Sequence, residues 1–222
     1  MIRTLDDLSR NLSDQLAWRK KELSEIKYLV ESKAIAQHKK NVFLRSSVAM
    51  IYAHWEGFLK LSGSYYLEYV YNQRLKNSDL SKNFLTMSLS SFANIFDNTK
   101  KYSHYGSVID FFDNELNSRS KIPYKSTIDT ESNLSSKVLR EIVWCLGLSY
   151  QPFEIKEKII DNKLLAKRNH IAHGEYLDVE PEDIIELRNE ILALMINFKN
   201  QIENAALLKN YIKIRNTVPN NT

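Results

Sequence analysis

An arginine and two histidines lie close together in the run Lys-Arg-Asn-His-Ile-Ala-His-Gly-Glu at residues 167–175. Arg168 and His173 are five positions apart, and Asn169 adds a neutral hydrogen-bonding group beside the arginine. A guanidinium is always charged and can hold a phosphate, whereas an imidazole titrates near neutral pH and can move a proton. Together these groups have the chemistry to cut RNA without a metal ion.

Two other polar residues are candidates for accessory roles. His170 either satisfies the last carbonyl groups of a helix, which is the interpretation that we favour, or is a second proton-handling group. Glu56, on an earlier predicted helix, either pairs with Lys60 on a wet face or faces Arg168 and orients its guanidinium. Arg168 itself has a structural alternative, in which it reaches across a helix interface to a carboxylate.

The run of residues 167–175 closes a predicted helix that extends from about residue 153 to about residue 173, with Pro152 at its start and Gly174 at its end. On a regular helix Arg168 and His173 point about 140° apart, so the helix alone cannot aim both at one point. A left-handed cap at Gly174 lets the imidazole swing toward the helix end. A two-fold dimer places Arg168 of one chain in a cleft with His173 of the other. We expect both.

Long amphipathic helices are predicted on either side of this run. Apolar residues recur at spacings of three, four and seven from about residue 5 to about residue 33, and the opposite face, which includes Arg19, is expected to be solvated. A second helix, at about residues 42–71, is rich in aromatic side chains. Core packing is their default explanation, and a dimer seam is the alternative. Pro181 opens a final helix with acidic residues in its first turn.

Between about residues 77 and 136, Ser, Thr and Asn become frequent and the helical period breaks. We interpret this segment as a variable insertion within a single domain of residues 1–222. Short helices are predicted at about residues 85–96 and 108–116. The basic loop at residues 117–126 is expected to be solvated, with RNA contact as the alternative. A short apolar helix then begins at Asn133 or Ser135 and stops at Gly147.

Composition favours an all-α protein. A chain of 222 residues suits one large domain, because cores stop growing at roughly 250 to 300 residues. Hydrophobic residues at 43% and charged residues at 26% are ordinary globular values, which excludes wholesale disorder. Five glycines and four prolines supply too little turn chemistry for many short strands. The predicted fold is a bundle of long antiparallel helices with a mixed helix and loop insertion.

Several classes of site are not indicated by the sequence. Cys145 lies in an apolar run and is expected to be a small buried hydrophobe. There is no HExxH, no Cys pair and no glycine-rich phosphate loop, so neither a metal site nor a cofactor is predicted. His38, His54 and His104 lack partners at a recognisable spacing and are expected to be structural or surface residues. The net charge of +4 is compatible with a polyanionic partner without requiring one. The chain has neither a signal-peptide pattern nor an apolar stretch of the ~20 residues that a membrane span needs, so a cytoplasmic protein with no membrane partner is expected.

The Arg-Asn-x-x-x-His run is the Rx4H form of the Rx4-6H pattern, and it resembles the motif of the HEPN superfamily. The resemblance is strongest over residues 164–195, where an apolar helix, the motif and a following long helix match the second half of the superfamily. The stretch His-Trp-Glu-Gly-Phe at residues 54–58 is similar to the corresponding part of HEPN ribonucleases of prokaryotic defence and toxin systems. The middle insertion is not covered.

The resemblance implies a helical bundle that dimerises and cleaves RNA at a cleft lined by both motifs. Arg168 would bind the scissile phosphate, His173 would transfer a proton and Asn169 would be the accessory polar residue. An antitoxin or a defence-system protein is a possible partner. Some toxin-type relatives carry a modifiable tyrosine two residues after the histidine, where this chain has Glu175, with Tyr176 one position later. The alternative is a non-catalytic dimeric helical module that binds nucleotide, RNA or a partner protein.

Overall fold

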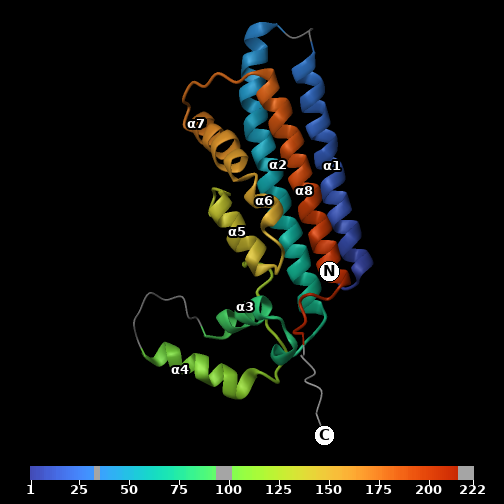
Figure 1. Ribbon diagram of the computed structural model, residues 1–222, viewed down its shortest axis with the longest axis vertical. Helices are drawn as coiled ribbons and strands as arrows, with labels where there is room; N and C mark the ends of the chain where they lie inside the picture. The colour runs from blue at the N-terminus through green and yellow to red at the C-terminus, as the bar shows by residue number, and fades with distance from the viewer. Residues whose placement is uncertain (33–35, 94–101, 215–222) are drawn as a thin grey trace.

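The computed structural model describes residues 1–32, 36–93 and 102–214, and over these residues the elements are helices joined by turns and loops (Figure 1). Three long helices lie side by side, namely α1 (Leu5–Glu31), α2 (Gln37–Asn72) and α8 (Pro181–Leu207). α1 runs antiparallel to the other two. α2 and α8 run in the same direction, because the chain between them returns to the start of α2. No β-strand occurs in the described part of the chain, and the predicted all-α class is confirmed.

α1 begins where its apolar pattern predicts. Thr4 caps it and forms a capping box with Asp7, a pairing that satisfies two of the free amide groups at the helix start. The predicted end at residue 33 lies outside the described residues. The expectation that Arg19 is solvated is wrong, because its side chain is only 3% exposed. Its Nε donates to the carbonyl oxygen of His54 at 3.2 Å, and its guanidinium stacks on Trp18 at 4.2 Å.

α2 starts at Gln37, earlier than predicted, and supplies much of the core. Tyr52, Trp55, Phe58 and Tyr66 are each 4% exposed or less. These aromatic side chains of α2 therefore pack in the core of a single chain, which agrees with core packing as the default explanation. His54 is also buried, with its Nε2 at 3.1 Å from the Glu22 carboxylate. The side chains of His38 and His104 lie outside the described residues.

The helices of the middle segment lie beyond the end of the bundle (Figure 1). It contains the 3-10 turn η1 (Asn77–Asp79), α3 (Lys82–Ala93) and α4 (Tyr102–Asp110), which continues into the π-helical turn η2 (Phe111–Glu115). α3 and α4 both begin earlier than the helices predicted at residues 85–96 and 108–116, and the predicted end at residue 96 is not described. The loop at residues 117–126 is non-helical, as predicted, and Arg119 forms an antiparallel bridge with Lys76.

After this bridge the chain returns along α2 as a non-helical strap, residues 119–134. The Tyr124 ring lies 5.1 Å from the Tyr71 ring near the end of α2. Further along, Ile128 packs on Gly63, where an added Cβ would meet it at 3.1 Å. At the end of the strap the Leu134 amide donates to the Tyr52 hydroxyl at 2.8 Å. The strap therefore fixes the loop before α5 (Ser136–Cys145) against the middle of α2.

α5 has the predicted boundaries. Ser135, one of the two predicted caps, accepts from the Val138 amide, and Gly147 after the helix adopts φ +65°, a conformation that glycine takes without strain. Cys145 is partly buried and packs against the core. Burial raises the pKa of its thiol to about 11, so it is an unreactive thiol at neutral pH.

The single helix predicted over residues 153–173 is interrupted. The chain forms α6 (Gln151–Glu154), a turn, the π-helical segment η3 (Ile159–Ala166) and then α7 (Lys167–Ala172). Ile160 and Leu164, in these wider π turns, are buried in the core. The π turns also change the direction, about the helix axis, in which the side chains of α7 point. The direction in which Arg168 points is therefore set by η3, which a regular 3.6-residue period does not predict.

Candidate active site

Arg168 projects from α7 onto α2 and the strap. Its guanidinium carbon lies 3.9 Å from the centre of the Tyr52 ring, and its Nη2 donates to the Ser132 carbonyl at 2.9 Å and to Asn133 Oδ1 at 3.2 Å. An arginine stacked on a ring and held by neutral acceptors keeps its full charge available to an anion. Among the described residues, Arg168 forms no ion pair with a carboxylate, so the structural alternative of an interface salt bridge is not what the fold provides.

An open hollow of about 590 Å³ lies in front of this guanidinium. Three small residues of α2, Ala49, Ala53 and Gly57, recur every four positions and form a low floor. The remaining lining residues are polar or aromatic, namely Tyr52, Glu56, Lys60, Asp129, Thr130, Ser132 and Arg168. Burial is the largest influence on Tyr52 and raises the pKa of its hydroxyl, which therefore stays neutral beside the arginine.

Glu56 shares the hollow with Arg168, yet in the part of the chain that the structure describes no hydrogen bond or ion pair joins the two side chains. The predicted orienting role is taken instead by the Tyr52 ring and by the two acceptors at the end of the strap. Lys60 lines the same hollow, one helical turn after Glu56.

His173 caps α7, and Gly174 after it adopts φ +78°. The Gly174 amide donates to the Ile171 carbonyl and the Glu175 amide donates to the His170 carbonyl. These two bonds define a Schellman motif, which confirms the predicted left-handed cap. His173 is exposed at this turn. No hydrogen bond to its imidazole occurs among the described residues, so neither ring nitrogen is engaged within this part of the chain.

Arg168 and His173 do not line the same hollow within one chain. Arg168 faces α2 and the strap, whereas His173 stands at the exposed end of α7. The cap turns the chain without turning the imidazole into the hollow. Asn169 is half-buried between them, and its carbonyl accepts from the His173 amide.

The favoured interpretation, in which His170 satisfies the last carbonyl groups of the helix, is wrong. Its imidazole Nδ1 contacts the Glu175 carboxylate, and both side chains are more than half exposed. The late carbonyls of α7 are satisfied by the backbone amides of the Schellman motif, so they need no histidine.

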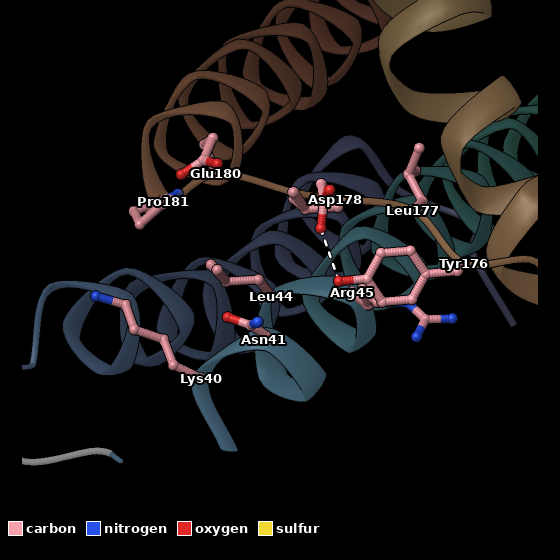
Figure 2. A pocket seen from close by; sticks show the side chains of 10 residues that line it. Lys40, Asn41, Leu44, Arg45, Tyr176, Leu177, Asp178, Glu180 and Pro181 are labelled. Atoms are coloured by element: carbon pink, nitrogen blue, oxygen red, sulfur yellow. Dashed lines mark hydrogen bonds between the residues drawn. The ribbon is translucent and has the colours of Figure 1, made fainter. Parts of the chain in front are cut away.

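No motif or residue spacing singles out Arg45, which lies on α2 beside the turn that follows His173. Its Nη2 donates to the Glu175 carbonyl at 3.0 Å, and its guanidinium lies 5.4 Å from the centre of the Tyr176 ring. Figure 2 shows Tyr176 above Arg45, with its hydroxyl directed to Asp178 at 2.8 Å. A small polar pocket of about 250 Å³ opens here. Arg45 thus anchors the turn after His173 to the start of α2.

No group of three or more His, Cys, Asp and Glu side chains with metal-binding geometry occurs in the described ranges. Over the same ranges no helix has the length and apolar content to cross a membrane.

An all-helical bundle in which α7 carries Arg168, stacked on Tyr52 of α2, and ends at its cap residue His173 defines a module of the HEPN type. The chain belongs to the RiboL-PSP-HEPN family, whose pattern matches residues 14–204. The match includes the middle insertion, which the motif resemblance did not cover. No curated protein and no solved structure was found to match the chain.

Proposed function

We propose that this protein is a metal-independent endoribonuclease of the HEPN type, acting in the cytoplasm in a prokaryotic defence or toxin-antitoxin setting. The observation that carries the proposal is the state of Arg168, a guanidinium stacked on Tyr52 and bound to neutral acceptors at the edge of an open hollow. A phosphate entering this hollow would meet a positioned charge. The exposed His173 on the same helix as Arg168 supplies an imidazole, a group that can transfer protons.

The proposed reaction uses the 2′-hydroxyl of the substrate as nucleophile. The 2′-oxygen bonds to the adjacent phosphorus and the bond from phosphorus to the 5′-oxygen breaks, which gives a 2′,3′-cyclic phosphate and a 5′-hydroxyl. His173 transfers a proton at the 2′-hydroxyl or at the leaving 5′-oxygen, and Arg168 stabilises the charge that develops on the phosphate. Asn169 is the accessory polar residue. His170, which pairs with Glu175, is an accessory candidate for proton handling, and Glu56 is an accessory residue in the hollow of Arg168.

The site is completed by a second copy of the chain in this proposal, because one chain does not bring Arg168 and His173 to one hollow. An exposed stripe on α2 supports such a contact. Met50 and Leu61 are 41% and 38% exposed, and with Ala53 and Gly57 they lie on one side of the helix. Ala53 and Gly57 also line the hollow, so a partner seated on this stripe would lie next to Arg168.

Sedimentation velocity tests this dimer. We expect the wild type to be a dimer with an interface of ~1,200 to 2,000 Å². Leu61→Arg places a long cation on the stripe without altering a residue that lines the hollow, and it should give a monomer that does not cleave RNA. Leu207→Arg alters an apolar residue that is 62% exposed at the other end of the bundle, and this control should remain a dimer. A monomeric wild type that retains ribonuclease activity would contradict the dimer.

Cleavage of total RNA tests the activity itself. The wild type should cleave, whereas Arg168→Ala and His173→Ala should lower the rate by at least ~10² to 10³. Arg168→Lys should not restore full activity, because a point charge cannot replace a planar fork on a phosphate. Circular dichroism should show that each variant keeps its helices. An alanine variant that cleaves at the wild-type rate would refute the assignment. Mixed dimers of the two alanine chains should recover part of the activity if the copies share a site.

A second candidate function is a non-catalytic dimeric module that binds nucleotide, RNA or a partner protein such as an antitoxin. The separation of Arg168 and His173 within one chain is the observation that favours it. A dimeric wild type that binds RNA and leaves it intact would support this function over the first.

A further inference from the structure

A basic and aromatic surface lies at the far end of the strap from Arg168. Its cations come from the segment that follows α2 and from the strap, and all of them are exposed: Arg74, Lys76, Arg119, Lys121 and Lys125. The bridge between Lys76 and Arg119 and the packing of Tyr124 on Tyr71 hold the two segments together. The surface is therefore built on fixed backbone and not on a free loop.

Several basic residues elsewhere in the described chain are neutralised by an ion pair, unlike these cations. Arg140, Lys156, Lys163, Lys167 and Lys199 are each paired with a carboxylate. None of the cations of the basic and aromatic surface has an ion pair within the described ranges. Their charges are thus not neutralised inside the chain and remain available to an anionic partner.

A hollow of about 320 Å³ opens between the cations. Tyr71, Pro123 and Tyr124 supply flat apolar walls, and Lys121 and Lys125 stand at its edge. Arg119 lies 5.0 Å from the centre of the Tyr71 ring, and Lys125 lies 5.9 Å from that of Tyr124. Aromatic faces flanked by cations are the combination that binds unpaired bases and their phosphates.

We propose that this surface binds single-stranded RNA, at a site separate from the hollow of Arg168. A base enters between Pro123 and Tyr124 and stacks on the ring, while Lys121, Lys125 and Arg119 contact the flanking phosphates. A duplex would keep its bases inside the helix and could not use the aromatic walls. A protein partner fits less well, because lysine is depleted in the centres of protein interfaces and is abundant here.

The position of the surface relates it to the candidate active site. Tyr52 and Tyr71 are 19 positions apart on α2, which is about 28 Å of helix axis. The strap connects the two ends, from Tyr124 beside Tyr71 to Leu134 beside Tyr52. A strand held at both sites would fall within the range of about 4 to 16 nucleotides of single-strand binding proteins. The idea that one strand occupies both sites rests on the proposed ribonuclease function, whereas RNA binding by the basic and aromatic surface does not.

Fluorescence anisotropy with a 12-nucleotide 2′-O-methyl oligouridine tests the proposal, because this probe lacks the nucleophile and cannot be cut. The double variant Lys121→Ala, Lys125→Ala should bind at least 10-fold more weakly, and the slope of log affinity against log salt should fall by about 1.4. Tyr124→Leu should weaken binding by roughly 5- to 150-fold with the salt slope unchanged. Thermal melts should confirm that both variants fold.

The matched control is Lys20→Ala, Lys21→Ala, which removes the same charge from an exposed part of α1 and should bind like the wild type. No binding by the wild type, or an equal loss in both double-lysine variants, would overturn the proposal. Specific binding without cleavage of natural RNA would refute the ribonuclease and leave this site standing. Cleavage with unchanged binding in the Lys121, Lys125 variant would refute this site alone.

Discussion

Replacing Tyr52 with Phe should lower the stability of the fold, whereas replacing Tyr66 with Phe should not. Both tyrosines are buried on α2. The Tyr52 hydroxyl accepts from the buried Leu134 amide at 2.8 Å, whereas the Tyr66 hydroxyl has no hydrogen-bond partner among the described residues. Tyr52→Phe leaves the Leu134 amide unsatisfied, and Tyr66→Phe removes a polar atom that is already unsatisfied.

An unsatisfied buried amide costs about 1 to 3 kcal/mol. For a chain of this length each kcal/mol lowers Tm by roughly 2 to 4 °C, so Tyr52→Phe should lower Tm by about 2 to 12 °C. Tyr66→Phe should leave Tm unchanged or raise it. Thermal unfolding followed by circular dichroism measures both.

Two substitutions of Tyr52 separate its effect on stability from its effect on function. Tyr52→Phe keeps the ring that lies 3.9 Å from the Arg168 guanidinium, so it should cleave RNA at close to the wild-type rate at a temperature where it is folded. Tyr52→Leu removes the ring and should lose activity as well as stability, because Arg168 loses its support. Equal melting temperatures for the two Phe variants, or full activity in Tyr52→Leu, would refute the reasoning.

Three further predictions follow from contacts around the motif. Gly174→Ala should lower the free energy of unfolding by about 1 to 2 kcal/mol in urea titrations, because the site requires φ +78° while no side chain crowds it. Arg45→Ala should slow RNA cleavage by less than Arg168→Ala does, since it only anchors the turn after the motif, and single-turnover rates would show this. Burial, the main influence, lowers the pKa of His54, so the folded chain binds the proton less readily than the unfolded chain. The stability that His54 contributes should be complete above pH ~6.5 and be lost as the pH falls from there toward the lowered pKa, and His54→Gln should show a smaller decline in unfolding free energy.

Helix positions were predictable wherever one helix buries one continuous stripe. The starts of α1, α5 and α8 follow from an apolar period and a capping residue or proline, and both are local signals. η3 was not predictable, because the π turns follow from how Ile160 and Leu164 pack on the bundle. Arg19 was wrongly predicted to be solvated, because its burial depends on two features of α2. These are the His54 carbonyl, which accepts from its Nε, and the space left by Gly57.

The candidate site was predictable in its residue types and not in its supporting contacts. Arg168 and His173 stand out by spacing alone. Tyr52 and Asn133, which hold the guanidinium, lie far from it in sequence. Tyr52 contacts it because α7 packs on α2, and Asn133 contacts it because the strap returns along α2. Whether the chain is a single domain of residues 1–222 with an insertion stays a prediction.

Product analysis with a chemically defined substrate tests the central claim most directly. A short RNA with one cut site is incubated with wild type or His173→Ala, in EDTA, and compared with the same RNA carrying one 2′-deoxy residue at the cut. The account predicts that only the wild type cleaves and only the unmodified RNA is cut, leaving a 2′,3′-cyclic phosphate and a 5′-hydroxyl. Loss of wild-type activity in EDTA with rescue by a divalent ion, or cleavage of the 2′-deoxy substrate, would contradict it.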